Sequence, residues 1–376
     1  MKVLILSMTV GQGHNSTSRA LRERLEAQGH TCEILDTYKF LNKAVGAAFD
    51  KGYTAMGRFL PKLNENIYSS AERANGRLDM KMYFPWAFAD LTKSKMQKYI
   101  AETKPDVVVC SVVMSAILMT TLKESHMLDE KIKTIGIVTD YSLHPFWEYT
   151  IMDYFVAANE LMIPEFLRRG ISEYKILTTG IPIAHKFSKT MSQEEARELL
   201  GLEKDKYTVL VSAGGMGFAG MPPVLQDIDG VQDIQIVAVC GSNARLKVKL
   251  DEMKFNNTVY VKGFVDNMDE YLDAADVIVS KPGGLSSSEA IAKCKPMIMT
   301  KPMPGVENMN HAFLLNNSLA LHANKYQPIS NVIMQMNINQ LKIDEMKMAH
   351  EKWGKKNSAQ DLACFIGRLE GQNQHR

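Results

Sequence analysis

The sequence carries no excess of charge of one sign and has few cysteines. Its 376 residues contain 44 Lys and Arg against 42 Asp and Glu, a net charge of +2, and 45% of them are hydrophobic. This composition is typical of a folded globular chain and excludes both intrinsic disorder and a general nucleic-acid-coating role. The five cysteines form no CxxC pair, which excludes a local zinc or redox motif and favours a reducing cytosol; they are Cys32, Cys110, Cys240, Cys294 and Cys364.

Long hydrophobic runs are also missing. The first apolar run begins at Val3 and soon gives way to glycines, whereas a signal peptide needs a longer apolar stretch and a small-residue cleavage site. Residues 107–122 are interrupted by two serines and two threonines and fall short of the roughly 20 apolar residues that span a bilayer. We therefore expect a first strand at the N-terminus, a buried strand and helix at 107–122, and no membrane-spanning helix.

Short β-branched runs alternate with longer amphipathic stretches, the pattern of βα units around a parallel sheet. A chain of 376 residues predicts two domains, because a domain holds about 100 to 200 residues. Near-continuous apolar runs indicate strands covered by helices on both faces. The expected strands are 3–8, 31–35, 107–111, 134–139, 154–158 and 175–179 in the first half, and 208–212, 234–239, 258–261, 277–280 and 296–300 in the second.

The segment 180–206 begins with Gly-Ile-Pro and then turns polar, so we interpret it as the connection between domains of residues 1–190 and 206–345. A C-terminal helix is expected over 346–376. A glycine loop follows the first strand of each half, SMTVGQGH at 7–14 and SAGGMGF at 212–218. Open α/β sheets bind ligands at the carboxyl ends of their strands, so the predicted site is a cleft between two nucleotide-fold domains.

Gly11, Gly13 and His14 follow the first strand. Glycines there allow a tight turn and let a ligand approach the amides at a helix start. A neutral imidazole at His14 is suited to accept a proton from an acceptor hydroxyl near pH 7. The alternative is a strand-to-helix turn whose histidine merely caps the helix.

A dinucleotide site is a second interpretation of these loops. Gly11-x-Gly13-x-x-Ser16 nearly fits GxGxxG, and Asp36 follows the second strand where a ribose-binding acid is expected. This alternative function is an NAD-dependent oxidoreductase. No Gly-Lys-Ser/Thr follows either loop, which excludes a P-loop.

The segment ADVIVSKPGGLSSSEA at 275–290 is the most informative one. A buried strand runs into Pro-Gly-Gly, and three serines open a helix whose free amides suit a diphosphate. Glu289 lies in that helix and is suited to bind both ribose hydroxyls. The alternative role of Glu289 is a capping-box residue at the same helix start.

The loop 300–310 is rich in proline and glycine yet carries Glu307, Asn308 and Asn310. Polar side chains on a loop at the carboxyl end of a strand fit sugar hydroxyls. The alternative is a solvated turn.

Asp140 and His144 follow the strand expected at 134–139 and lie among Tyr141, Phe146 and Trp147. A carboxylate and an imidazole beside aromatic rings suit a base or an acceptor contact. No third ligand lies nearby to complete a metal site. The alternative is a structural Asp that caps a turn.

Residues 39–104 show no strand pattern but contain 12 Lys or Arg, 6 Asp or Glu, and 10 of the 30 aromatic residues. A helical insertion of this composition is attracted to an anionic bilayer surface. The alternative is an ordinary helical hairpin with its aromatic side chains in its own core. No nucleic-acid-reading motif accompanies these residues, so we expect no nucleic-acid partner.

Seven short motifs follow one another along the chain. They are Ser7-x-x-x-Gly11-x-Gly13-His14, Thr139-Asp140-Tyr141-x-x-His144, Gly180-Ile-Pro-Ile183, Gly214-Gly-x-Gly217, Lys262-Gly-Phe-Val265 with Asn267-Met268, Ser280-Lys-Pro-Gly-Gly284 with Ser288-Glu289-Ala290, and Pro304-Gly305-x-Glu307-x-x-Asn310. Residues 1 to about 320 resemble the monogalactosyldiacylglycerol synthase and processive diacylglycerol glucosyltransferase group in the order and spacing of these motifs. This family 28 type of glycosyltransferase is related to the N-acetylglucosaminyltransferase that forms lipid II.

The resemblance implies a GT-B glycosyltransferase, an α/β protein of two Rossmann-like domains with a C-terminal helical tail. It implies an inverting, metal-independent transfer of a hexose from a UDP-sugar to a lipid hydroxyl such as that of diacylglycerol, with no cofactor. In the implied donor site, Phe264 and Val265 bind the uracil, Glu289 binds the ribose, and Glu307 and Asn310 bind the hexose. The diphosphate is bound by Gly217, Gly283, Gly284, Leu285 and Ser286. The implied acceptor site contains His14 or Asp140 as the base, with Gly11, Gly13, Tyr141 and His144.

One residue departs from the family pattern. The family usually shows Pro-Gly-Gln-Glu in the sugar loop, but here Val306 replaces the glutamine and removes a hydrogen-bonding side chain. Loss of one such partner changes sugar preference, so glucose, galactose and N-acetylglucosamine stay open, as does a UDP-GlcNAc transferase with another acceptor. The expected location is cytoplasmic, peripheral on the inner face of the cell membrane.

Overall fold

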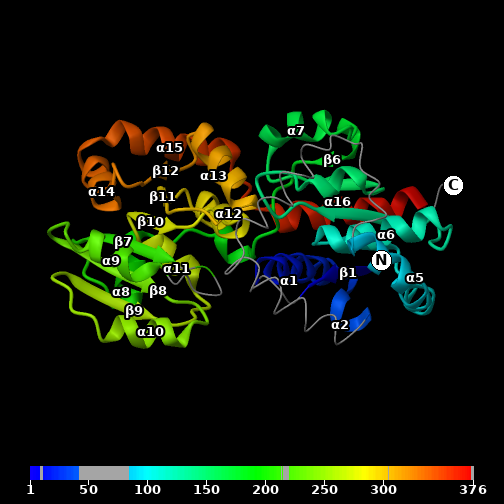
Figure 1. Ribbon diagram of the computed structural model, residues 1–376, viewed down its shortest axis with the longest axis horizontal. Helices are drawn as coiled ribbons and strands as arrows, with labels where there is room; N and C mark the ends of the chain where they lie inside the picture. Colours follow the sequence, from blue (N-terminus) through cyan, green and yellow to red (C-terminus); the bar gives the residue numbers. More distant parts are fainter. Residues whose placement is uncertain (9–11, 42–83, 213, 215–219, 304, 374–376) are drawn as a thin grey trace. The chain divides into compact units, whose positions relative to one another are not determined.

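The computed structural model describes residues 1–8, 12–41, 84–212, 214, 220–303 and 305–373. The chain divides into two compact units, each built on one sheet (Figure 1). The N-terminal unit comprises Met1–His185, Met303–Val306 and Asn357–Arg376, and the C-terminal unit comprises Lys186–Pro302 and Glu307–Lys356. The expected α/β class with two Rossmann-like units is confirmed.

The N-terminal unit contains a parallel sheet of six strands in the order β2-β1-β3-β4-β5-β6. The strands are β1 (Lys2–Ser7), β2 (Thr31–Asp36), β3 (Val107–Cys110), β4 (Lys133–Ile137), β5 (Tyr154–Val156) and β6 (Ile176–Leu177). All four residues of β3 are buried, as expected for a central strand covered on both faces.

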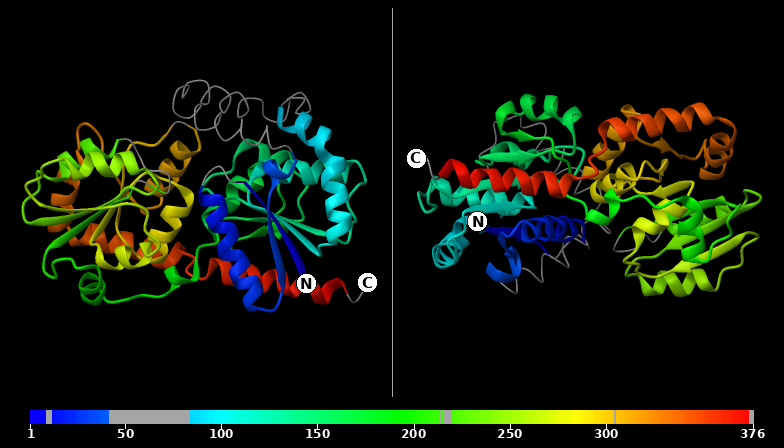
Figure 2. Two further views of the ribbon diagram at one scale, coloured as in Figure 1. Left: turned by 90° about the horizontal axis from the view of Figure 1, so that it is seen from below. Right: turned by 180° about the vertical axis from the view of Figure 1, so that it is seen from behind.

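The helices of this unit cover both faces of its sheet (Figure 2). They are α1 (Gln12–Ala27), α2 (Thr37–Leu41), α5 (Phe84–Thr103), α6 (Val113–Glu124), α7 (Ile163–Arg168) and α16 (Ser358–Asn373). Short 3-10 helices occur at η2 (Pro145–Tyr149), η3 (Glu160–Met162), η4 (Glu173–Lys175) and η5 (His185–Ser188). Most of the insertion expected at 39–104 lies outside the described residues, and α5 is its described C-terminal part.

The C-terminal unit contains a second parallel sheet of six strands in the order β12-β11-β10-β7-β8-β9, the strand order of a dinucleotide-binding fold. The strands are β7 (Tyr207–Ser212), β8 (Ile234–Val239), β9 (Thr258–Lys262), β10 (Val277–Ser280), β11 (Met297–Met299) and β12 (Leu321–His322). β12 was not predicted, because two residues are too few to show a periodicity. The helices are α8 (Gln193–Leu200), α9 (Met221–Ile228), α10 (Ala244–Asp251), α11 (Met268–Ala274), α12 (Gly284–Ala292), α13 (Val306–Asn316), α14 (Ile329–Ile338) and α15 (Gln340–Trp353).

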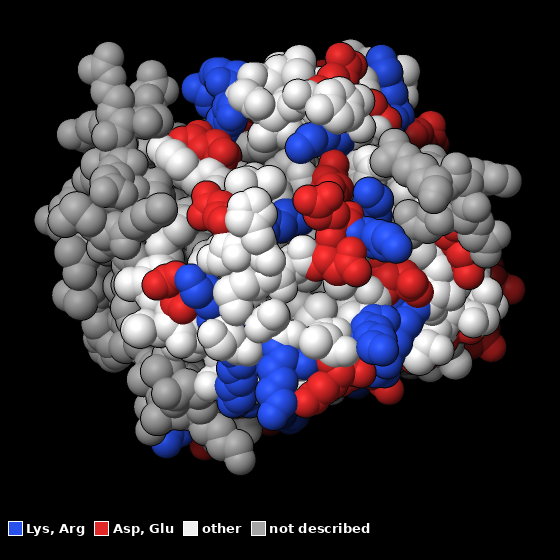
Figure 3. Space-filling model, turned by 90° about the vertical axis from the view of Figure 1, so that its right-hand side faces the viewer, with Lys and Arg blue, Asp and Glu red and all other residues white. Residues whose placement is uncertain are grey.

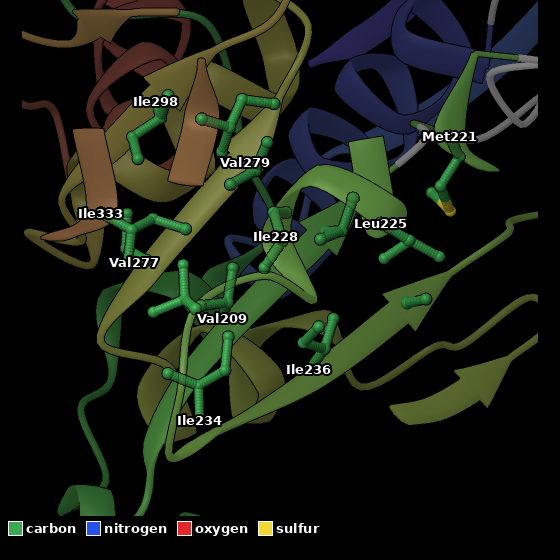
Figure 4. Packing of buried hydrophobic residues seen from close by; sticks show 14 of the residues in the cluster. Val209, Met221, Leu225, Ile228, Ile234, Ile236, Val277, Val279, Ile298 and Ile333 are labelled. Carbon is green, nitrogen blue, oxygen red and sulfur yellow. The ribbon is translucent and has the colours of Figure 1, made fainter. Parts of the chain in front are cut away.

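One continuous core holds this sheet to its helices. Leu225 of α9 and Ile333 of α14 belong to one buried cluster with side chains of four strands (Figure 4). These strand residues are Val209 of β7, Ile236 of β8, Val277 of β10 and Ile298 of β11. Burial of such apolar side chains is the main stabilising term of the unit. The core therefore fixes where the carboxyl ends of β7 and β10 lie.

The segment expected to connect the domains is part of the C-terminal unit from Lys186 onward. Within it, Ser192 and Glu195 form a capping box at the start of α8, and Gly201 ends the helix in a left-handed conformation. Arg197 of α8 then pairs with Asp276 at 2.7 Å. The polar sequence of α8 therefore reflects ion pairs to its own unit and not a solvated linker.

The single C-terminal helix expected at 346–376 is two helices, α15 and α16. The chain leaves α15 at Gly354, whose backbone is extended, and a Cβ atom there would collide with the carbonyl oxygen of His350, so this break requires a glycine. Beyond this break, α16 belongs to the N-terminal unit, where Leu362, Ala363 and Ile366 share a core with β1 and β3. The C-terminal helix thus completes the N-terminal unit.

The described surface carries both signs of charge. Lys and Arg side chains lie between Asp and Glu side chains on the face in Figure 3, so its described part forms no patch of one sign. Among the described residues, no helix combines the length and the apolar character that are needed to cross a bilayer.

The packing of α16 gives a stability prediction. Leu362→Ala removes a fully buried side chain from the core of the N-terminal unit and should lower its free energy of unfolding by about 2–5 kcal/mol. Amide hydrogen exchange of β1 and β3 measures this loss. Asp361→Asn, an exposed change on the same helix, is the control and should cost less than about 1 kcal/mol. Equal protection in both variants would contradict the packing role.

Candidate functional site

The strand order reverses at one place in each sheet, between β1 and β3 and between β7 and β10. Ligands of open α/β sheets bind at such a switch point, outside the carboxyl ends of the strands. His14 follows β1 and α12 follows β10, whereas Asp140 and His144 follow β4, and Phe264 and Val265 follow β9.

His14 lies in the first turns of α1, directly after the switch-point loop of the N-terminal unit. Its Nδ1 is 3.1 Å from Oγ1 of Thr139, in the segment that follows β4. Burial lowers the pKa of His14 below its usual value of 6.5, and a backbone hydrogen bond from the side chain to Ser111 opposes this shift. The structure therefore brings the His14 motif and the Thr139 motif together and keeps the imidazole neutral at pH 7.

The remaining N-terminal residues differ in their surroundings. Gly13 lies in the first turn of α1, whereas Gly11 is outside the described residues. Asp140 is half-buried next to Thr139, and Tyr141 is buried. Asp140 thus lies beside the residue that contacts the imidazole of His14.

His144 has a structural role in addition to any contact with an acceptor. Its Nδ1 accepts a hydrogen bond from the backbone N–H of Phe146 at 3.1 Å and caps η2. Burial first, and the charge of Arg169 second, lower the pKa of His144 to about 4. The ring is therefore neutral at pH 7, with one nitrogen used by the turn.

In the C-terminal unit, α12 begins directly after the switch-point loop of β10. Its N-cap is Gly283, and no side chain caps the helix among the described residues. The N–H groups of Gly284, Leu285 and Ser286 have no acceptor inside the helix, because the first intrahelical acceptor, the carbonyl of Gly283, bonds Ser287. Together with the helix dipole, these amides are suited to bind an anion.

Gly283 departs from this arrangement. Its own N–H donates to the carbonyl oxygen of Lys281 at 2.8 Å, so the amide that we expected at a diphosphate closes a tight turn instead. Gly217, the other glycine expected there, lies outside the described residues.

Glu289 lies on α12 and is half-buried. Burial raises the pKa of its carboxyl group to about 8; Lys186 opposes this shift and Asp269 adds to it. The alternative role as a capping-box residue is wrong, because α12 begins at Gly284 and no side chain caps it. A carboxyl group that keeps its proton at pH 7 and caps no helix is suited to bind the hydroxyl groups of a ligand.

Phe264 and Val265 follow β9. The ring of Phe264 is 65% exposed, which is unusual for a large apolar side chain, and Val265 is half-buried. An exposed aromatic ring after the carboxyl end of β9 provides a surface for a planar base.

Glu307 and Asn310, which we expected on a loop at 300–310, lie in the helix α13 and hold the turn before α12. Glu307 pairs with Lys281 at 2.8 Å, and the side-chain amide of Asn310 donates to the carbonyl oxygen of Pro282 at 3.1 Å. Asn310 is fully buried. The two side chains expected at a sugar are thus also contacts between α13 and the Lys281-Pro-Gly-Gly turn.

The sequence motifs did not assign a role to Lys281. Its side-chain carbon Cε would lie 3.6 Å from a Cβ atom at Gly214, which has φ of +66° in the loop after β7. The only available signal was the position of Lys281 at the end of a buried strand. No cluster of three or more potential metal ligands occurs within the described ranges.

Comparison with known proteins matches both units to glycosyltransferase families. Residues 14–183 match the monogalactosyldiacylglycerol (MGDG) synthase family, and residues 208–364 match the glycosyltransferase family 28 C-terminal domain. A processive diacylglycerol β-glucosyltransferase of Bacillus cereus strain B4264 is 30% identical over 321 residues, which cover 82% of this chain and 78% of the relative.

Solved structures confirm the expected GT-B fold. MurG of Acinetobacter baumannii superimposes with a TM-score of 0.65 at 14% identity, covering 98% of this chain and 99% of that one. HepE of Anabaena in complex with UDP-glucose gives a TM-score of 0.56 at 11% identity, covering 98% and 100%.

The pKa of Glu289 predicts a pH dependence of stability. An unfolded chain ionises this carboxyl near its ordinary pKa of 4.5, whereas the folded chain holds the proton to about pH 8. Between these values the unfolded state binds fewer protons, so this group makes stability fall as pH rises. Glu289→Gln should therefore become progressively more stable relative to wild type from pH 5 to pH 8, as measured by urea unfolding. Glu252→Gln, at the exposed end of α10, is the control, and a constant difference from pH 5 to pH 8 between Glu289→Gln and wild type would contradict the assignment.

Proposed function

The chain belongs to the family of monogalactosyldiacylglycerol synthases and processive diacylglycerol β-glucosyltransferases and is a glycosyltransferase, and from this we propose that it transfers a hexose from a UDP-sugar to the hydroxyl of a lipid such as diacylglycerol. The observation that carries the proposal is the uncapped N-terminus of α12 at the switch point of the C-terminal sheet.

The donor site in this proposal is built around α12. The amides of Gly284, Leu285 and Ser286 bind the diphosphate, and the dipole of the helix adds to the attraction. Glu289 binds the ribose hydroxyls, and Phe264 with Val265 holds the uracil. The name of the Bacillus cereus relative supports a glucosyl donor, and the UDP-glucose complex of a protein of the same fold supports a uridine nucleotide.

The acceptor base in this proposal is His14. Its lowered pKa leaves the imidazole neutral at pH 7, which is the form that accepts a proton. The contact of Nδ1 with Thr139 orients the ring. Asp140 beside Thr139 stabilises the imidazolium that forms.

The reaction is a direct displacement with inversion. The acceptor oxygen forms a bond to the anomeric carbon as the bond from that carbon to the diphosphate oxygen breaks, and the hydroxyl proton passes to His14. UDP leaves with the electron pair, and the amides of α12 stabilise the growing negative charge. We propose that this transfer proceeds without a metal or cofactor, because backbone amides supply the electrostatic stabilisation.

An NAD-dependent oxidoreductase is not favoured. That function requires the carboxylate of Asp36 at a ribose, but Asp36 Oδ1 accepts a hydrogen bond from the N–H of Lys39 at the start of α2. A UDP-GlcNAc transferase is disfavoured by the glucosyltransferase relatives. The apolar side chain of Val306, half-buried at the start of α13, forms no hydrogen bond that would distinguish glucose from N-acetylglucosamine.

We propose a cytoplasmic location, peripheral on the inner face of the membrane, because a lipid acceptor lies in a bilayer. The basic and aromatic insertion at 39–104 supports this location by composition. At its described end, Lys93 pairs with Asp90 at 2.6 Å, so part of the basic charge on α5 is neutralised internally.

A panel of UDP-sugars tests the proposed function. UDP-glucose, UDP-galactose and UDP-GlcNAc are each offered with diacylglycerol in vesicles or with a soluble acceptor, and UDP release is measured. We expect release with UDP-glucose and diacylglycerol. Binding of UDP-sugar without release on addition of any acceptor would indicate a sensor and contradict the transferase proposal.

If His14 is the base, its replacement should slow the reaction without weakening the binding of UDP. His14→Ala should lower the rate of UDP release about 10²–10⁴-fold, while the Kd for UDP changes less than about twofold, because His14 contacts the acceptor and not the donor. The acid limb of the wild-type pH–rate profile should lie below pH 6.5, in keeping with the lowered pKa, and should disappear in the variant. His126→Asn, at an exposed left-handed position, is the control and should retain activity. An active His14→Ala variant would remove this residue from the mechanism.

A further inference from the structure

Lys281 occupies a position that links three segments of the C-terminal unit. It is the first residue beyond the carboxyl end of β10 and so stands at the switch point between β7 and β10. Its stem lies against Gly214 of the loop after β7, and its ammonium group reaches Glu307 in the first turn of α13. One side chain therefore contacts both neighbouring loops of the candidate site.

The backbone of the same turn is fixed independently of the ammonium group. The carbonyl oxygen of Lys281 accepts the N–H of Gly283, and the carbonyl of Pro282 accepts the side chain of the fully buried Asn310. The path of the chain into α12 thus has two anchors that do not need the charge of Lys281. What the ammonium group adds is a fixed partner for Glu307.

The pair with Glu307 is partly withdrawn from solvent. The side chain of Lys281 is 24% exposed, that of Glu307 is 17% exposed, and Nζ lies 2.8 Å from Oε1. A charge-assisted hydrogen bond at this length restricts the carboxylate to one orientation, and partial burial limits its screening by water.

We propose that Lys281 is a positioning residue for sugar recognition: its ammonium group orients the Glu307 carboxylate so that Glu307 binds the hydroxyls of the donor hexose. This inference rests on the proposed function, since it assumes a UDP-hexose at the start of α12. The role is distinct from a direct charge contact with the diphosphate, which would strengthen binding of UDP and UDP-sugar alike. A residue that acts through Glu307 affects only ligands that carry the hexose.

The experiment compares UDP-glucose with UDP by calorimetry on the full chain. Lys281→Met keeps the stem against Gly214 but removes the charge. We expect it to weaken binding of UDP-glucose about 10-fold while binding of UDP changes less than about twofold, and Lys281→Arg should restore most of the loss because it keeps the charge. Equal weakening of both ligands, or no weakening of either, would overturn the proposal.

A double-variant cycle separates positioning from general damage to the fold. Glu307→Gln should reproduce the selective loss, and Lys281→Met combined with Glu307→Gln should bind UDP-glucose no more weakly than Glu307→Gln alone. Additive losses would show that Lys281 acts independently of Glu307. If Lys281→Met does not fold, the Arg and Gln variants decide the question: the proposal requires near-wild-type selectivity for Lys281→Arg and selective loss for Glu307→Gln.

The matched control is Lys206→Met. Lys206 pairs with Glu203 at 3.1 Å and stands just before β7, at the opposite end of the same sheet. Its loss should leave both affinities unchanged. Wild-type protein that binds neither UDP nor UDP-glucose would defeat the proposed function itself, whereas wild-type binding together with unchanged selectivity in Lys281→Met would defeat only the role of Lys281.

Discussion

The unpaired amides at the start of α12 are the feature on which the chemistry of the C-terminal unit depends. A helix start usually receives a side-chain cap, and glycine in its place costs helix stability of about a few tenths of a kcal/mol. Here Gly283 is the N-cap and supplies no side chain. The buried core of β7, β10 and their covering helices holds this helix start at the switch point. An arrangement that is unfavourable for the isolated helix is therefore available for an anionic ligand.

Charged side chains around this helix start pair with one another, so they act on it indirectly. Lys281 is paired with Glu307, and Lys186 pairs with Asp269 at 3.0 Å while its charge also acts on Glu289. Burial keeps Glu289 protonated to about pH 8. In the proposed function, the anion is bound by backbone dipoles, and the hydroxyl groups are bound by the carboxyl groups of Glu289 and Glu307.

Two features of the fold contradict the simplest interpretation of the sequence. The polar segment before β7 contains α8, whose Arg197 pairs with Asp276; the sequence did not show this ion pair, because the two residues lie far apart in the chain. The C-terminal tail divides at Gly354, and α16 completes the N-terminal core. Composition alone does not show which partner a charged or apolar helix face will find.

The sequence by itself determined every described strand except β12, the parallel pairing of the strands and the place of the Pro-Gly-Gly turn before α12, because these depend on local periodicity and on residues with special backbone preferences. It also pointed to His14, Glu289 and Glu307. The tertiary structure alone decided that Thr139 contacts His14, that Gly283 uses its own amide, and that Lys281 reaches Glu307. Contacts between residues distant in sequence, and the pKa shifts that burial causes, arise only when separate strands and helices pack together.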